Sequence, residues 1–303
     1  MTRRAPVLSL VVGLVACFLT ACGGSVDTRE IVVTTNILGD VVRNIVGDAG
    51  EVRVLMKPNA DPHSFGVSAQ DAAGMADADL IVYNGLGLEE GVARHVESAA
   101  ADGVATVAVG EHIDPIEYAA GDSAGAPDPH FWMDPRRMIV AVDVIADAIT
   151  REVAGIDTGA IEVNASRYRH ELDQLDGSMA TRFAQIPSGR RNLVTNHHVL
   201  GYLAQRYDFN VVGAIVPSGT TLASPSASDL QSLVHAVEST GVPAIFVDSS
   251  QPDRLARALA EQARITVRIV GLYTESLSPP GTPGATYLDL MTANAESIVT
   301  GLR

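Results

Sequence analysis

In the first half of the chain, short apolar runs alternate with stretches whose apolar residues recur at helical spacing. The runs, each about as long as one buried strand, cover residues 30–35, 51–56, 79–84 and 104–109. The helical stretches cover residues 37–47, 68–78 and 88–100. Strands that alternate with helices in this way predict a parallel sheet covered by helices.

The second half of the chain repeats this alternation. Its strand-like runs cover residues 192–196, 209–216, 243–248 and 265–270. Its helical stretches cover residues 199–207, 226–240 and 252–263, and a last helix is expected from near Thr286 towards Leu302. Ser68 with Asp71, and Ser226 with Asp229, form capping boxes that mark two helix starts. A second α/β lobe is therefore predicted.

Two further helical stretches lie between the halves, at residues 135–154 and 159–186. The second contains no proline, and at ~1.5 Å per residue it would be about 40 Å long. The predicted fold is α/β, with two Rossmann-like lobes that contain parallel sheets and are joined by this long rigid helix. We place the N-terminal lobe at residues 30–157, the linking helix at 158–187 and the C-terminal lobe at 188–303.

The N-terminus carries a targeting pattern. A short basic region, MTRR, precedes an apolar run, and LTAC at residues 19–22 places small residues before a cysteine. This order predicts a lipoprotein signal peptide at residues 1–21, cleaved to leave Cys22 lipidated; the alternative is an ordinary signal peptide with a chance cysteine. We therefore expect a lipid-anchored protein on the extracytoplasmic face of the cell membrane. Residues 22–29 form a flexible tether, and residues 111–128 are the next most flexible segment.

Composition narrows the possible chemistry. Cys17 and Cys22 are the two cysteines of the chain, and both belong to the processed N-terminus. The mature protein therefore has no disulfide, and any metal site must use histidine, carboxylates or water. A formal charge of −15 argues against nucleic acid as a partner. We expect the mature protein to act as a monomer.

Candidate ligands follow four of the predicted strands, two in each half of the chain. They are His63, His130, His197 and Glu275. The carboxyl ends of parallel strands border the ligand crevice of such folds, and three imidazoles with one carboxylate are a normal tetrahedral set for zinc. His63 and His130 each end an Asp-Pro-His triplet, in which Asp-Pro restrains the backbone before the ring.

Other polar residues near these motifs are expected to have structural roles. His197 and His198 are adjacent, so at most one of them should face the cleft. The remaining histidines are expected at the surface: His95, His112, His170 and His235. Three aspartates are expected as turn or cap groups: Asp61, Asp128 and Asp134. Phe131 and Trp132 are expected to form a packed wall beside the site.

Several motifs together carry a family resemblance. They are the lipobox, DPHSF, PHFWMDP, TNHHVLGYLA, TESLSPPGTPGATYLDLM and the long central helix. With these motifs the chain resembles the cluster A-I substrate-binding lipoproteins of zinc or manganese ABC transporters, over nearly all of its mature length. The resemblance implies two α/β lobes with the metal bound between them, and an ABC permease as partner. It carries over His63, His130 and His197 as ligands, with His197 preferred because it stands two residues after Thr195.

The chain departs from the family pattern at two places. The fourth ligand of the family is usually aspartate, whereas Glu275 stands in TESL here, which leaves its denticity open. Many zinc-binding members also have a histidine-rich loop near residues 111–128, where this chain has only His112. Manganese-binding members usually have a carboxylate at the position of His197, so zinc is favoured over manganese.

Two other functional classes have less support in the sequence. A secreted zinc hydrolase would need an open metal position and a general base, and the chain has neither HExxH nor G-x-S-x-G. A binding lipoprotein for haem or a chelated metal would need a basic cleft, and Lys57 is the only lysine. We therefore expect a zinc-binding transport protein rather than an enzyme.

Overall fold

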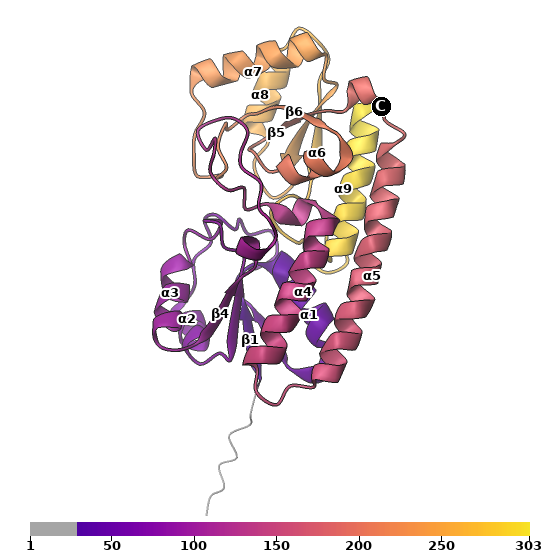
Figure 1. Ribbon diagram of the computed structural model, residues 1–303. Helices are drawn as coiled ribbons and strands as arrows, with labels where there is room; N and C mark the ends of the chain where they lie inside the picture. The colour runs from indigo at the N-terminus through magenta and orange to yellow at the C-terminus, as the bar shows by residue number, and fades with distance from the viewer. Residues whose placement is uncertain (1–28) are drawn as a thin grey trace, which may run out of the picture.

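The computed structural model describes residues 29–303 and contains two four-stranded parallel sheets, one in each lobe (Figure 1). The expected signal peptide, Cys22 and the tether up to residue 28 lie outside the described residues. The N-terminal sheet has the order β2-β1-β3-β4. Its strands are β1 (Glu30–Val33), β2 (Glu51–Val54), β3 (Leu80–Tyr83) and β4 (Ala105–Ala108).

Helices cover both faces of the N-terminal sheet. These helices include α1 (Asn36–Val46), α2 (Ala69–Ala76) and α3 (Ala93–Ala101). Ile31 and Val33 of β1 pack in the same core cluster as α1, whereas Val32 between them packs with residues of α2 and α3. Successive strand side chains point to opposite faces, so a strand covered on both sides must be apolar at every position.

The C-terminal sheet has the corresponding order, β6-β5-β7-β8. Its strands are β5 (Asn192–Thr195), β6 (Asn210–Ala214), β7 (Ala244–Asp248) and β8 (Arg268–Leu272). Its helices are α6 (Gly201–Tyr207), α7 (Ala227–Thr240), α8 (Arg254–Gln262) and α9 (Tyr287–Leu302). The predicted capping boxes at the starts of α2 and α7 are both present. The expectation of two α/β lobes with parallel sheets is confirmed.

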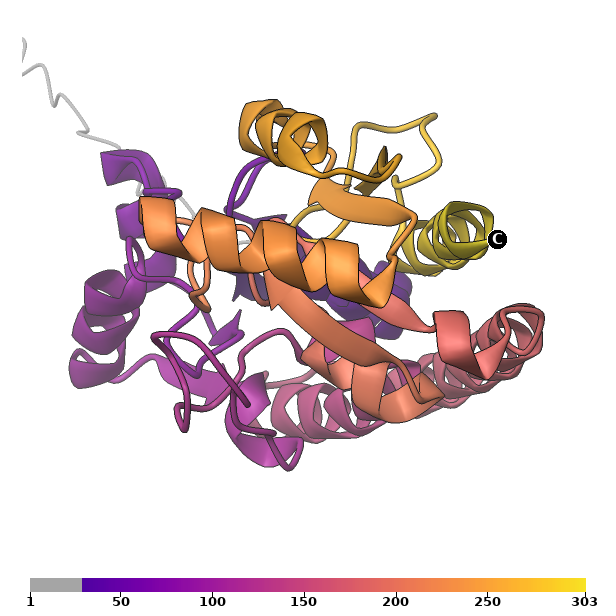
Figure 2. The ribbon, with the colours of Figure 1, turned by 90° about the horizontal axis from the view of Figure 1, so that it is seen from above.

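Along the chain, two helices connect the N-terminal sheet to the C-terminal sheet, α4 (Pro135–Glu152) and α5 (Thr158–Phe183). Asp134 caps α4 as expected, because its side chain accepts a hydrogen bond from the backbone of Arg136. Helix α5 has 26 residues, packs against α1 and α4, and lies beside α9 (Figures 1 and 2). It therefore extends along both lobes. Within the described part of the chain, no helix combines the length and apolar character needed to cross a membrane.

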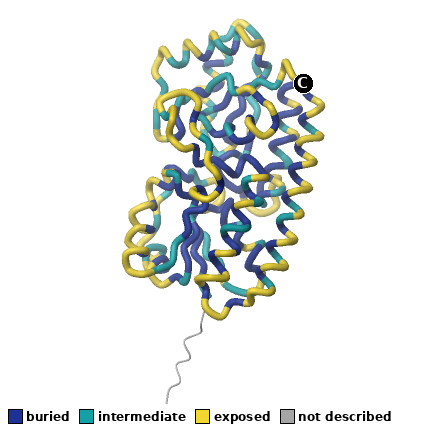
Figure 3. Tube along the Cα trace, viewed as in Figure 1, coloured by how far each residue is buried: buried dark blue, intermediate teal, exposed yellow. Residues whose placement is uncertain are grey.

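Residues 111–128, expected to be the most flexible segment after the tether, are bonded to the C-terminal lobe. The backbone of Asp122 donates to the carbonyl of Pro217 at 2.8 Å, and Gly219 donates to Ser123 Oγ at 3.0 Å. Tyr118 is buried, although most of its neighbours along the segment are exposed. In Figure 3, buried residues follow the sheets and the junction between the lobes.

Candidate metal centre

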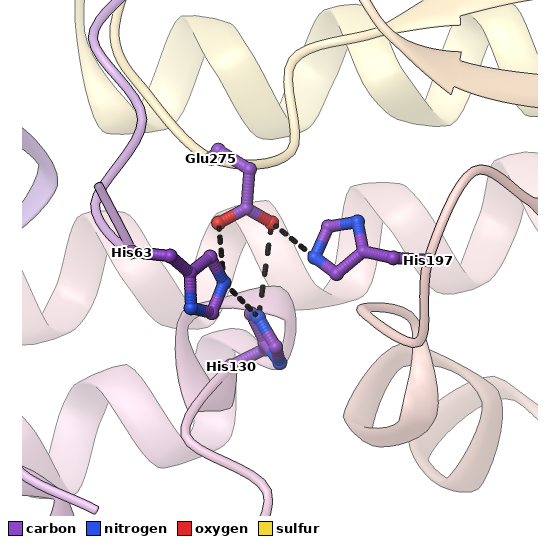
Figure 4. A group of neighbouring side chains, drawn as sticks. All are labelled: His63, His130, His197 and Glu275. Carbon is purple, nitrogen blue, oxygen red and sulfur yellow. Dashed lines mark hydrogen bonds and ion pairs between the residues drawn. The ribbon is translucent and has the colours of Figure 1, made fainter. Parts of the chain in front are cut away.

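The structure brings the four predicted ligand residues together between the lobes (Figure 4). His63 lies in the loop after β2, and His130 directly precedes the short helix Phe131–Met133. His197 lies two residues after the end of β5, and Glu275 follows β8. Each side chain is at most 2% exposed. Because the carboxyl ends of both sheets face the junction, residues far apart in the sequence meet there.

The spacing of the donor atoms fits one small metal ion. His63 Nε2 lies 3.4 Å from His130 Nε2, and His197 Nε2 lies 3.1 Å from Glu275 Oε1. The carboxylate oxygens of Glu275 lie 3.7 Å from His63 Nε2 and 3.8 Å from His130 Nε2. Two ligands of a tetrahedral zinc ion, each ~2.0–2.1 Å from the metal, are about 3.3 Å apart. The four atoms therefore surround a space of suitable size.

Several buried polar atoms of the four ligand side chains have no hydrogen-bond partner among residues 29–303. They include both ring nitrogens of His197 and both carboxylate oxygens of Glu275. A buried polar atom without a partner is costly, because it has lost its hydration and gained nothing in exchange. A cation between the rings and the carboxylate would satisfy His197 Nε2 and Glu275 together.

Burial also sets the protonation of the site. It lowers the pKa of His63 to about 2, helped by the neighbouring His130 and His197, and lowers the pKa of His197 to about 4. Burial raises the pKa of Glu275 to about 8. At neutral pH the rings of His63 and His197 are therefore neutral and ready to bind a metal, whereas Glu275 must release a proton first.

The two Asp-Pro-His triplets adopt the same local structure. Asp61 Oδ1 accepts a hydrogen bond from the backbone nitrogen of His63, and Asp128 Oδ1 accepts one from that of His130, both at 2.9 Å. Each aspartate thus closes a turn that positions the histidine two residues later. The expectation that Asp61 and Asp128 are turn groups is confirmed.

The surroundings of the site also match the remaining expectations. Phe131 and Trp132 are buried, and the Trp132 ring lies 5.2 Å from the His130 ring, measured between centroids. His198 is only half-buried and is not part of the group of four. It lines a separate cavity of about 400 Å³ together with Tyr118 and Asp128. The other histidines are exposed, namely His95, His112, His170 and His235.

Sequence reasoning missed residues that hold the Glu275 segment. Asp248, the last residue of β7, accepts hydrogen bonds through Oδ2 from the backbone nitrogens of Thr274, at 3.0 Å, and Glu275, at 3.2 Å. Asn36 at the start of α1 accepts from the backbone of Leu277 at 2.9 Å and donates to Ser276 Oγ at 2.8 Å. Asp248 ends β7, and Asn36 lies shortly after β1. Their positions at strand ends could have identified them as residues near the site.

Comparison with known proteins gives a consistent family assignment. The model of the family described as "Zinc-uptake complex component A periplasmic" matches residues 31–301. The zinc-binding protein TroA of Treponema pallidum is 32% identical, and the match covers 97% of this chain and 96% of the relative. The manganese ABC transporter substrate-binding lipoprotein PsaA of Streptococcus pneumoniae is 29% identical, over 100% of this chain and 99% of the relative.

Solved structures share the same architecture. The periplasmic zinc-binding protein TroA from Treponema pallidum superposes with a TM-score of 0.83 at 30% identity, covering 91% of this chain and 99% of that chain. A manganese-bound periplasmic metal-binding protein from Candidatus Liberibacter asiaticus gives a TM-score of 0.80 at 27% identity, covering 91% of this chain and 100% of that chain. The similarity therefore extends over both lobes.

Proposed function

Since the chain belongs to the family of periplasmic zinc-uptake components, we propose that it captures one zinc ion outside the cytoplasm and delivers it to an ABC permease. It is the substrate-binding protein of a metal ABC transporter, and it is therefore not an enzyme. Its relatives include both a zinc-binding protein and manganese transport proteins. The identity of the metal must then be argued from the donor atoms.

The ligands of the transported ion are His63, His130, His197 and Glu275. The observation that carries this assignment is the meeting of four buried side chains whose donor atoms lie within 4.8 Å of one another. Two come from each lobe, so the ion would be held only while the lobes are together. Glu275 would supply the negative charge that three neutral imidazoles leave uncompensated.

Zinc fits this donor set better than manganese. Imidazole nitrogen suits zinc, whereas manganese prefers carboxylate, carbonyl and water oxygens. Manganese also lies at the weak end of the affinity order for divalent metals at a given site. Three nitrogens and one carboxylate therefore favour zinc, and manganese remains the alternative cargo.

A hydrolytic role has little support from the site. A catalytic zinc ion needs a coordination position open to water and a nearby general base. Here four protein donors are available for a tetrahedral ion, so no position is reserved for water. Zinc is therefore the cargo of this protein rather than a cofactor.

The function is tested by metal analysis and titration. Protein purified without added metal should contain one zinc per chain, and calorimetry should show binding of a single ion. Alanine at His63, His130 or His197 should weaken binding about 10-fold or more, because one of four ligands is lost. His198→Ala, which removes the neighbouring imidazole, should leave affinity unchanged. A ligand variant that binds like the wild type would remove that residue from the site.

We propose further that the protein is a monomer tethered by lipid on Cys22. The lipid tether is supported by the LTAC motif and by the lipoprotein character of relatives such as PsaA. A single acyl chain binds a membrane weakly, whereas several chains anchor stably. Cys22→Ala removes the acylated residue, so the variant should move from the membrane fraction to the soluble fraction. Retention of the variant in the membrane fraction would place the anchor elsewhere.

A further inference from the structure

The ring of His130 is held on the side that faces away from the other ligands. Asp128 Oδ1 lies 2.7 Å from His130 Nδ1, and the same oxygen accepts from the backbone nitrogen of His130. Both side chains are buried, Asp128 at 2% exposure and His130 at 0%. By contrast, Nδ1 of His197 is buried without a hydrogen-bond partner among the described residues.

This contact fixes the tautomer of His130. A carboxylate oxygen accepts hydrogen bonds, so this contact favours the tautomer of His130 that carries its proton on Nδ1. The lone pair is then on Nε2, the nitrogen that faces His63 and Glu275. A carboxylate on the second nitrogen orients a metal-binding imidazole and makes it a stronger donor.

Asp128 is itself held in place by hydrogen bonds to its backbone. Its nitrogen donates to the carbonyl of Ile116 at 2.8 Å, and its carbonyl accepts from the hydroxyl of Tyr202 at 2.8 Å. The backbone of Asp128 is therefore held by the 111–128 segment and by α6, so its carboxylate can hold the His130 ring in one orientation.

Tyr118 connects the same ring nitrogen to the other lobe. Its hydroxyl oxygen lies 3.2 Å from His130 Nδ1 and donates to the carbonyl of Gly219 at 3.2 Å. Gly219 follows β6 and belongs to the C-terminal lobe. A Cβ at residue 219 would collide with the Tyr118 ring, so this close approach requires glycine. The hydroxyl can share the Nδ1 proton because its own proton points to Gly219.

Building on the proposed function, we propose that Asp128 and Tyr118 are positioning residues for the zinc ion. Asp128 fixes the Nδ1–H tautomer and orientation of His130. Tyr118 ties this ring nitrogen to the C-terminal lobe, so separation of the lobes removes one support of the ligand. Loss of either side chain should therefore speed zinc release, although neither residue touches the ion.

The first test compares aspartate variants. Asp128→Ala should weaken zinc binding about 10-fold or more, and Asp128→Asn should weaken it less, because an amide oxygen can still accept from Nδ1. Asp134→Asn is the matched control, since it changes a buried aspartate of the same motif that caps α4. Equal affinities in all three variants and the wild type would overturn the role of Asp128.

The second test compares tyrosine variants by stopped-flow zinc release into a chelator. Tyr118→Phe removes only the hydroxyl and should speed release several-fold. Tyr287→Phe is the control, because its buried hydroxyl donates to the carbonyl of Trp132 at 2.6 Å without touching the His130 ring. Equal release rates for the two variants would overturn the role of Tyr118, because they would indicate general loosening of the segment.

A readout on the metal-free protein separates this inference from the proposed function. Nitrogen chemical shifts of the His130 ring should show a single Nδ1–H tautomer in the wild type and a mixture in Asp128→Ala. If His130→Ala leaves zinc binding intact, the proposed ligand set is wrong. If His130→Ala weakens binding while the Asp128 and Tyr118 variants match their controls, only the positioning inference is wrong.

Discussion

At the residue scale, the site depends on burial as much as on ligand identity. In water an imidazole has a pKa near ~6.5, so a metal would compete with protons for it around and below that pH. Burial lowers the pKa of His63 and His197 far below this range and raises that of Glu275. The proton that zinc must displace at neutral pH is therefore on the carboxylate.

Zinc affinity should accordingly follow the titration of Glu275. The pKa of Glu275 is about 8, so at a pH below this value zinc binding displaces the Glu275 proton. Zinc affinity should therefore rise with pH and level off above a pH of about 8. One displaced proton gives about a tenfold change per pH unit. Calorimetric titrations between mildly acid and alkaline pH measure this slope. The same slope in Glu275→Gln would show that another group carries the proton.

Glu275→Gln should change affinity and stability in opposite directions. The amide loses the charge that balances zinc, so binding should weaken clearly. The raised pKa of Glu275 gives stability that is present below its usual value of 4.5 and is lost as pH rises through about 8. A neutral side chain avoids this loss. The metal-free variant should therefore melt above the metal-free wild type at pH 7.5, measured with a chelator present; a lower melting temperature would contradict this account.

At the element scale, Asp176 ties the long helix α5 to two other helices. Its carboxylate accepts from Arg136 Nε of α4 at 2.8 Å, from Arg206 Nη2 of α6 at 2.6 Å, and from the hydroxyl of Tyr207 at 2.9 Å. Burial raises the pKa of Asp176, but hydrogen bonds from these three residues outweigh it and lower the pKa overall. Helix α4 follows the His130 segment and α6 follows His197, so this contact fixes the helices behind two ligand loops.

Asp176→Asn should destabilise the protein by about 2 kcal/mol, because hydrogen bonds from charged groups are worth ~1.5–3 kcal/mol each and an amide retains only part of them. Urea denaturation monitored by circular dichroism measures the change. Asp173→Asn is the matched control, since Asp173 also pairs with Arg136, at 2.9 Å, but is about half exposed. An exposed pair contributes little, so the control should change stability by under about 1 kcal/mol. Equal effects would deny Asp176 a special role.

At the scale of the whole molecule, the ion would join the two lobes. His63 and His130 belong to the N-terminal lobe, and His197 and Glu275 to the C-terminal lobe. Other contacts cross the same junction without metal, including those of Asn36 with the segment after Glu275 and of Trp132 with the carbonyl of Thr274. The lobes are therefore already aligned, and zinc adds the last set of bonds.

Zinc should stabilise the whole protein as one unit. A ligand at 100 times its dissociation constant adds about 2.7 kcal/mol to the free energy of unfolding. Differential scanning calorimetry should show a higher melting temperature and a single transition with saturating zinc. His197→Ala should lose most of this shift, because the C-terminal lobe then contributes only Glu275. An unchanged melting temperature of the wild type in zinc would contradict a site shared between the lobes.

The sequence by itself determined the features that depend on neighbouring residues. Apolar runs and helical spacing located the strands and helices, Ser68 and Ser226 marked helix starts, and Asp-Pro-His indicated turns that present a histidine. These are local because a hydrogen bond or a helix period involves residues a few positions apart. The strand ends also indicated which side chains would border a cleft.

Only the tertiary structure decided which groups support those side chains. Asp248 lies 27 positions before Glu275, Tyr118 reaches Gly219 across 101 positions, and Asn36 reaches Leu277 across 241. No local pattern encodes such pairs. Asp248 and Glu275 meet because β7 pairs with β8 within the C-terminal lobe, and the other two pairs join one lobe to the other. Burial, which sets the pKa values of His63, His197 and Glu275, arises from the meeting of the lobes, because the lobes together exclude water from side chains that each lobe carries at its edge.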